Sequence, residues 1–238
     1  MTELPAALNP DLVIRDHLMA VRERIHRACV AAGREPSSVR LLAVSKTFGP
    51  QAVEAAAAAG QKAFGENYLQ EAVAKIQACG PGLEWHCIGP VQSNKTKLVA
   101  AHFDWLHTLD RLKIAERLSE QRTPDQAPLN VCLQVNIDGE DSKSGVAPQD
   151  VLALAQAVAD LPQLRLRGLM TIPAPSRDFA SQLAVHQSAM ALFQQVKSQL
   201  PEPNDFDTLS MGMSADLEAA IHAGSTLVRV GSAIFGQR

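Results

Sequence analysis

The alternation of short apolar runs with segments of helical period is the feature that most constrains the fold of this chain. Eight apolar runs have the length and composition of buried strands, and each leads into a helical pattern or the start of one. The expected strands are 40–45, 62–65, 84–89, 105–108, 129–137, 164–171, 206–210 and 226–230. The expected helices are 11–32, 50–59, 67–78, 93–101, 111–122, 148–160, 179–199 and 214–223.

Eight β/α units within 238 residues match the α/β class and a single TIM (β/α)8 barrel, for which ~250 residues is typical. A doubly wound open sheet is the alternative, because strand spacing does not distinguish a closed sheet from one with free edges. The number of units favours the barrel. Because no Pro/Gly-rich linker or change of composition divides the chain, residues 1–238 are expected to form one domain.

Composition excludes several classes of protein and partner. A net charge of −3 without any basic run gives no general attraction to nucleic acid or anionic lipid. No segment approaches the ~20 unbroken apolar residues of a membrane span, and residues 1–11 lack the basic start and apolar run of a secretion signal. The four cysteines are far apart, with no CxxC pair, which fits a reducing compartment. We expect a soluble, cytoplasmic protein.

Lys46 is the first candidate for chemistry, because it ends the first apolar strand just before Pro50 opens a helix. The carboxyl ends of barrel strands face the active site, so Lys46 is expected at the barrel mouth. Enclosure by apolar walls would lower the pKa of its amine, which could then attack a carbonyl and form a Schiff base. The alternative is a lysine that only extends its ammonium into water at a strand end.

A phosphate site is expected after the last two strands. Ser210-Met211-Gly212-Met213-Ser214 follows the seventh strand and Gly231-Ser232 follows the eighth, where barrels often bind phosphate with backbone N–H groups and helix amino ends. The ordinary interpretation is that Ser214 caps a helix and that the glycines are turn residues. Asp216 and Glu218 would repel an anion, so the backbone of both loops must supply most of the binding.

A Schiff-base lysine opposite a phosphate site suits a phosphorylated aldehyde, and pyridoxal phosphate (PLP) is such a cofactor. Arg229 precedes Gly231 by two residues, so both side chains are expected on the same side of the strand. An arginine facing the pyridine nitrogen keeps that nitrogen unprotonated and weakens the ring as an electron sink. The alternative for Arg229 is a phosphate or carboxylate partner elsewhere.

Other strand ends supply further candidates for the pocket. Asn67 follows the second strand, where it would either bond to the ring hydroxyl of the cofactor or cap the next helix. His86 in the third strand would line the pocket, although a lone histidine in an apolar strand is more often a core residue. The acidic loop 138–145 lacks the spacing of a calcium loop, so no metal is expected. Its Lys143 is either a solvated lysine or an attractor of phosphate.

Several segments, in order along nearly the whole chain, resemble the pyridoxal phosphate homeostasis proteins, the YggS/PROSC family. They are Ala43-Val44-Ser45-Lys46-Thr47, Phe64-Gly65-Glu66-Asn67-Tyr68, His86-Cys87-Ile88-Gly89-Pro90-Val91-Gln92-Ser93-Asn94-Lys95, Ser142-Lys143-Ser144-Gly145, Arg167-Gly168-Leu169-Met170, Ser210-Met211-Gly212-Met213-Ser214 and Val228-Arg229-Val230-Gly231.

The resemblance implies a barrel like the amino-terminal domain of alanine racemase, with Lys46 as the Schiff-base lysine. It implies that residues 210–214 with Gly231 and Ser232 hold the phosphate, and that Arg229 faces the pyridine nitrogen. Where Gly-Thr is often expected, this chain has Gly231-Ser232, which keeps the hydroxyl. Members of the family are described as monomeric PLP-binding proteins that affect vitamin B6 balance, without an established catalytic reaction.

Two functions of different class therefore remain: a PLP carrier that buffers the cofactor or passes it to apo-enzymes, and a PLP-dependent amino-acid racemase. A two-base racemase needs an acid/base on the ring face opposite the lysine. No second domain is expected after the last strand, and Tyr68 is the sole tyrosine of this sequence. These features favour the carrier, which is not an enzyme. A Schiff-base aldolase is a third possibility, and it would be colourless.

Overall fold

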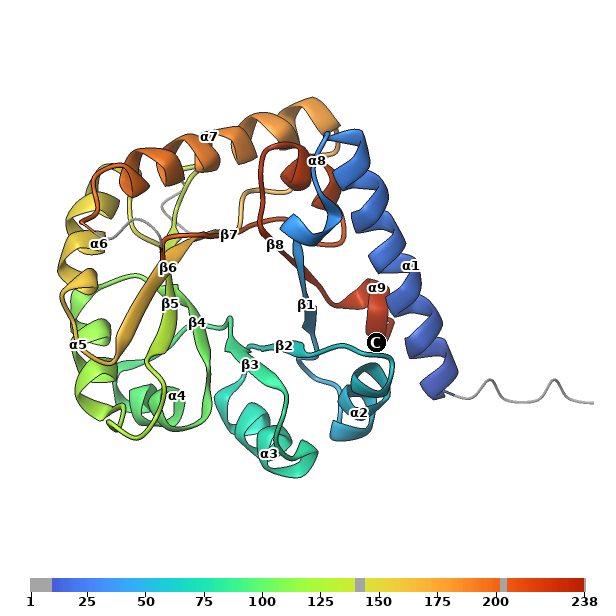
Figure 1. Ribbon diagram of the computed structural model, residues 1–238, viewed down its shortest axis with the longest axis horizontal. Coiled ribbons are helices and arrows are strands. Elements are labelled where there is room, and N and C mark those ends of the chain that lie inside the picture. The colour runs from blue at the N-terminus through green and yellow to red at the C-terminus, as the bar shows by residue number, and fades with distance from the viewer. Residues whose placement is uncertain (1–9, 140–143, 202–204, 238) are drawn as a thin grey trace, which may run out of the picture.

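Eight parallel strands close into a barrel in the computed structural model, which describes residues 10–139, 144–201 and 205–237 (Figure 1). Each strand pairs with the next along the chain, and β8 pairs with β1, with Leu41 opposite Val228. The strands are β1 (Arg40–Val44), β2 (Ala63–Glu66), β3 (Glu84–Cys87), β4 (Trp105–Leu109), β5 (Leu129–Val135), β6 (Leu164–Thr171), β7 (Thr208–Ser210) and β8 (Leu227–Val230).

The helices form an outer layer around this barrel (Figure 1). They are α1 (Pro10–Ala31), α2 (Pro50–Ala58), α3 (Leu69–Cys79), α4 (Thr96–His102), α5 (Leu112–Gln121), α6 (Val151–Ala159), α7 (Phe179–Lys197), α8 (Leu217–His222) and α9 (Ser232–Phe235). The additional helix α1 precedes the first strand and packs against α2, α8 and α9. Within the described part of the chain, no helix is long and apolar enough to cross a membrane.

Two kinds of core follow from the alternation of side chains along each strand. The large core lies between strands and helices; strand residues such as Phe64, Leu106 and Leu133 pack there against helix residues such as Leu118. Inside the barrel, smaller apolar clusters remain, one of them formed by Trp105, Cys132 and Met170. The buried residues also include polar ones, among them His86, His107, Ser210 and Arg229.

The predicted TIM barrel is confirmed, and the open-sheet alternative is wrong because β1 and β8 pair. The expected strand 84–89 ends early, at Cys87, and the apolar residue Ile88 lies beyond it near the barrel mouth. The expected helices 93–101 and 148–160 each begin with a short 3₁₀ turn, at Ser93–Lys95 and Pro148–Asp150. The expected helix 214–223 is shorter, because α8 begins at Leu217.

Candidate functional site

One cavity at the carboxyl ends of the strands gathers most of the predicted site residues. Its volume is about 360 Å³. The residues that line it come from β1, β8 and the segments after β1, β2, β3, β6, β7 and β8: Val44, Lys46, Asn67, Ile88, Ile172, Met213, Ser214, Ala215, Arg229, Gly231 and Ser232. This is the end of a (β/α)8 barrel at which active sites are found.

Lys46 lines the cavity from the loop that follows β1, and its side chain is exposed. From the sequence, apolar walls are expected to enclose its amine. Val44, Ile88 and Ile172 do line the cavity, but they leave the Lys46 side chain exposed. The reason is that β1 ends at Val44, so Lys46 lies two residues beyond the strand and outside the packed interior. Its amine is therefore accessible from solvent, while its neighbours on both sides are held by the protein.

A buried ion cluster holds the backbone on both sides of Lys46. The ammonium of Lys75, which is 2% exposed, donates to the carbonyl oxygen of Ser45 at 2.8 Å and to Glu66 Oε1 at 2.6 Å. Ser45 Oγ also donates to Glu66 Oε1, at 2.6 Å. Lys75 Nζ lies 2.9 Å from Glu71 Oε1, and that oxygen accepts the backbone N–H of Thr47 at 2.7 Å.

Thr47 has a φ of 73°, which is unusual for a β-branched residue and costs on the order of 1 kcal/mol or more. The bond from its N–H to Glu71 supports this conformation. Burial is the main influence on Glu66 and raises the pKa of its carboxyl, although the bonds from Lys75 and Ser45 act in the opposite direction. The ion cluster thus fixes the point where the Lys46 side chain leaves the backbone.

Arg229 forms a cationic floor for the cavity and is 4% exposed. Its Nη1 donates to the carbonyl oxygen and to Oγ of Ser210, both at 2.8 Å, and Nη2 donates to the carbonyl oxygen of Thr171 at 2.9 Å. Burial lowers the pKa of Arg229 to about 10. The guanidinium therefore remains charged near neutral pH and is held in one orientation by β6 and β7.

Asn67 supplies a buried acceptor that no described residue satisfies. Asn67 lines the cavity, and its Oδ1 is buried without a hydrogen-bond partner. The N-cap position of the following helix is Tyr68, so Asn67 is not the cap of that helix. Gly89 lies directly behind it, because a Cβ there would be 2.1 Å from the carbonyl oxygen of Asn67. An unsatisfied buried acceptor usually marks a bound partner, and a ring hydroxyl of a cofactor fits this one.

The segments after β7 and β8 bring Met213, Ser214, Gly231 and Ser232 into the cavity, as the sequence predicted. Asp216 and Glu218, which are expected to repel an anion, are each bonded to other groups of the protein. Asp216 Oδ1 accepts the N–H of Met213 at 2.7 Å, and its Oδ2 lies 3.0 Å from His186 Nε2. Glu218 pairs with Arg24 at 2.9 Å. Burial raises the pKa of Asp216, but the His186 and Met213 bonds outweigh it and lower the pKa.

Three predicted site residues do not line this cavity. His86 is fully buried in the barrel interior, and its ring contacts Glu84 and His107, because it lies two residues before Ile88, which does reach the cavity. Ser210 is also buried, and its hydroxyl oxygen accepts a hydrogen bond from Arg229. Gly212 has a φ of 90°, and a Cβ there would lie 2.5 Å from Ala220 Cβ, so helix packing requires the glycine. Lys143 lies outside the described residues.

The sequence did not identify which apolar residues line the cavity, namely Val44, Ile88 and Ile172, nor the ion cluster around Lys75. The walls lie at or just after the ends of β1, β3 and β6, so the rule used for Lys46 would have found them. Lys75 also left a signal, because it lies three residues after Ala72 and six after Leu69, both on the buried face of α3. A lysine in an apolar helical stripe indicates a buried pair.

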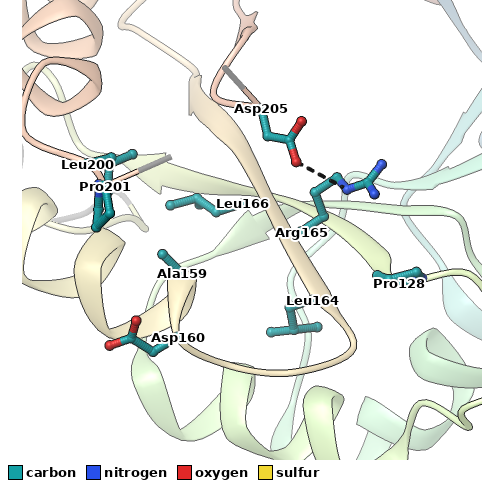
Figure 2. A pocket seen from close by; sticks show the side chains of 9 residues that line it. All are labelled: Pro128, Ala159, Asp160, Leu164, Arg165, Leu166, Leu200, Pro201 and Asp205. Atoms are coloured by element: carbon teal, nitrogen blue, oxygen red, sulfur yellow. Dashed lines mark ion pairs between the residues drawn. The ribbon is translucent and has the colours of Figure 1, made fainter. Parts of the chain in front are cut away.

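A second cavity of about 340 Å³ lies at the opposite end of the barrel, near the start of β5 and β6 (Figure 2). Leu164 and Leu166 line it, and Arg165 pairs with Asp205 across its edge at 3.4 Å. Because it is at the amino ends of the strands, it has no access to Lys46. Nowhere in residues 10–139, 144–201 and 205–237 do three His, Cys, Asp or Glu side chains form a potential metal site.

Comparison with known proteins agrees with this geometry. The family model "Alanine racemase, N-terminal domain" matches residues 17–238. A pyridoxal phosphate homeostasis protein of Pseudomonas aeruginosa is 56% identical over 227 residues, with 94% of this chain and 96% of that protein covered. The protein of the same name from Escherichia coli K12 is 53% identical over 229 residues, with 94% of this chain and 97% of that protein covered.

Solved structures show the same architecture. PipY of Synechococcus elongatus, described with PLP bound, has a TM-score of 0.81 at 35% identity and covers 94% of this chain and 100% of its own. Alanine racemase of Corynebacterium glutamicum has a TM-score of 0.65 at 21% identity. It covers 93% of this chain but only 61% of its own, and at this identity the likeness concerns the fold alone.

Proposed function

The chain belongs to the family of pyridoxal phosphate homeostasis proteins, and from this membership we propose that it binds PLP as a Schiff base on Lys46 and buffers or delivers it within the cell. The observation that carries the proposal is the single cavity in which Lys46, the buried cation Arg229 and the hydroxyls of Ser214 and Ser232 meet. These are the groups that a phosphorylated pyridine aldehyde requires.

The covalent step needs only the Lys46 amine and the cofactor aldehyde. The amine forms a C=N bond to the aldehyde carbon, and the aldehyde oxygen leaves as one water. The exposure of Lys46 suits this exchange in both directions, because water and cofactor can reach the amine. PLP supplies an aldehyde for capture and a ring that absorbs at the edge of the visible range.

The other groups of the cavity would hold the cofactor without reacting. The hydroxyls of Ser214 and Ser232 and the backbone N–H groups of residues 214–215 and 231–232 would bind the phosphate, since the N–H of Met213 is already bonded to Asp216. Arg229 would donate to the pyridine nitrogen and keep it unprotonated, which weakens the ring as an electron sink. Asn67 Oδ1 would accept the ring hydroxyl.

A carrier is favoured over a racemase by the composition of the cavity. Among its described lining residues, Lys46 and Arg229 are the titratable side chains, and Tyr68 is not one of the lining residues. The relatives of this protein are named for homeostasis rather than for a reaction, and no catalytic reaction is assigned here. We propose that the protein acts as a cytoplasmic monomer and that its partners, besides PLP, are apo-enzymes that use PLP.

An absorbance titration with PLP tests the proposal. The protein is expected to develop the visible-edge band of a protein-bound Schiff base, Lys46→Ala is expected to lose it, and the exposed Lys62→Ala, at the other end of the barrel, is expected to keep it. Racemisation of alanine should be absent. A wild-type protein without the band contradicts the proposal, and Lys46-dependent racemisation would establish an enzyme instead.

A further inference from the structure

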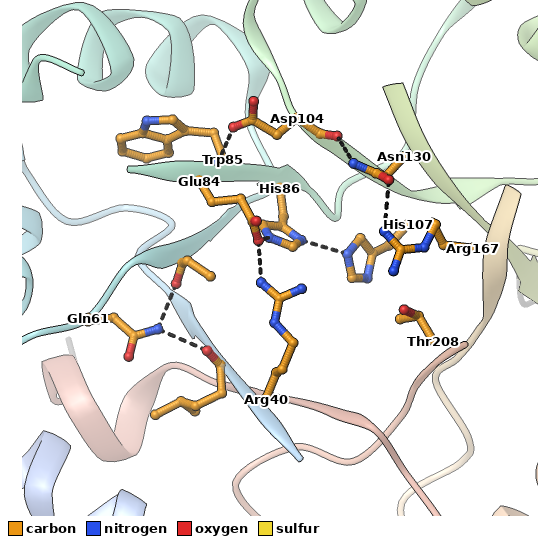
Figure 3. A network of polar contacts seen from close by, with 12 residues as sticks. Arg40, Gln61, Glu84, Trp85, His86, Asp104, His107, Asn130, Arg167 and Thr208 are labelled. Atoms are coloured by element: carbon orange, nitrogen blue, oxygen red, sulfur yellow. Dashed lines mark hydrogen bonds and ion pairs between the residues drawn. The ribbon is translucent and has the colours of Figure 1, made fainter. Parts of the chain in front are cut away.

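An unbroken chain of hydrogen bonds crosses the barrel interior from its amino end to Arg229. At the amino end, Arg40 Nη2 donates to Glu84 Oε1 at 2.5 Å, and the same oxygen lies 2.6 Å from His86 Nε2 (Figure 3). His86 Nδ1 lies 2.8 Å from His107 Nε2 (Figure 3). The chain continues from His107 Nδ1 to Ser210 Oγ at 2.9 Å, and from Ser210 Oγ to Arg229 Nη1 at 2.8 Å.

When both rings are neutral, the two ends of the chain fix the direction of every bond in it. Glu84 is an acceptor, because contacts with His86 and Arg40 outweigh the effect of burial and lower its pKa to about 2. His86 therefore donates from Nε2 and, when neutral, accepts at Nδ1. His107 must then donate from Nε2 and accept at Nδ1 from the hydroxyl of Ser210. The serine oxygen is left to accept from Arg229, which has only donors.

Burial keeps both histidines neutral, as this pattern requires. Each ring is fully buried, and the cost of burying a charge lowers the pKa of His86 and lowers that of His107 well below its usual value. The charged groups facing them from neighbouring elements are Arg40 on β1, Glu84 on β3, Asp104 before β4, Arg167 on β6 and Arg229 on β8. His86 also stacks on Trp105, with ring centroids 5.2 Å apart.

We propose that His86 and His107 are positioning residues that act on Arg229 through Ser210. They turn the serine hydroxyl hydrogen away from the guanidinium and present the serine lone pair to it, with the Glu84 carboxylate as the fixed end of the chain. Arg229 is thereby kept in one orientation beneath the cavity. Where the sequence analysis expected His86 to touch the cofactor, the structure assigns it this indirect role.

The tautomers of the two rings test the proposal on the unaltered protein. Long-range ¹H–¹⁵N spectra of protein labelled with ¹⁵N-histidine are expected to show His86 and His107 as neutral rings that carry hydrogen on Nε2 at pH 7. Single substitutions assign the two signals. A ring that carries hydrogen on Nδ1, or on both nitrogens, breaks the direction of the chain and overturns the inference, whether or not the protein binds PLP.

A substitution pair at His107 tests the effect on the cavity, and this readout alone rests on the proposed function. The amide of His107→Gln can still accept from Ser210 and donate to His86, whereas His107→Leu can do neither. In absorbance titrations, His107→Leu is expected to weaken PLP binding about tenfold, the factor for loss of one buried hydrogen bond to a charged network. His107→Gln should stay within about threefold of wild type.

Thr208→Val is the matched control, because it removes a hydroxyl from the same strand as Ser210 but lies outside the chain. It is expected to bind PLP like wild type. If His107→Gln binds as weakly as His107→Leu, the hydrogen-bond direction has no role and the proposal fails. If wild-type protein gives no PLP band at all, the proposed function fails while the tautomer result still decides the inference.

Discussion

Replacing Lys75 by methionine is expected to destabilise the protein strongly and to loosen the loop that carries Lys46. The substitution removes donors to Ser45, Glu66 and Glu71 while leaving the Glu66 carboxylate fully buried. Removal of one partner from a buried ion pair costs about 3–5 kcal/mol, because the remaining charge is uncompensated. We expect a loss of free energy of unfolding in this range at pH 8 and a smaller loss at pH 6, where Glu66 is protonated more readily.

Urea denaturation monitored by circular dichroism measures this loss, with Lys62→Met as the control. Lys62 is exposed, so its replacement should change stability by no more than about 0.5 kcal/mol. Adding Glu66→Gln to Lys75→Met should recover more than half of the loss, because the neutral amide still accepts from Ser45. A cost below about 1 kcal/mol for Lys75→Met, or no recovery in the double variant, would refute this account of the ion cluster.

Two further predictions concern the buried histidines and the packing behind Asn67. The lowered pKa values of His86 and His107 mean that below pH ~6.5 the unfolded chain binds protons that the folded protein does not. Stability is therefore present above this pH and should fall by about 2 kcal/mol between pH 7 and pH 5 for each ring that stays neutral; pH-independent urea midpoints would contradict this. Gly89→Ala places a Cβ 2.1 Å from the Asn67 carbonyl oxygen. It should lower the free energy of unfolding by about 1–3 kcal/mol and weaken PLP binding. Wild-type values in urea denaturation and in absorbance titrations would contradict the packing argument.

The sequence predicted the barrel because strand and helix periods alternate eight times, a local property that tertiary contacts did not overturn. Every expected element end lies within three residues of the one observed. The larger differences include the start of α8, which comes late because Asp216 bonds to the N–H of Met213 and to His186 on α7, which holds residues 213–216 as a turn. Such a contact between distant segments leaves no local signal.

Some residues of the site could be predicted from the sequence and others could not. Residues at the carboxyl ends of strands, such as Lys46, Asn67 and Arg229, could be predicted because the fold alone brings those ends together. His86 was expected at the barrel mouth but lies deeper in the barrel interior, because the sequence does not show which residue of a strand is level with the mouth. The partners of His107 and Lys75 depend on three-dimensional register, so their roles became visible only in the structure.

Mapping of the covalent adduct tests the central claim most directly. Wild-type protein is mixed with an equimolar amount of PLP, reduced with borohydride, digested and analysed by mass spectrometry. The account predicts that the reduced pyridoxyl phosphate adduct lies on the peptide that contains Lys46. A dominant adduct on any other lysine, or full visible-edge absorbance with no adduct on Lys46, would contradict it.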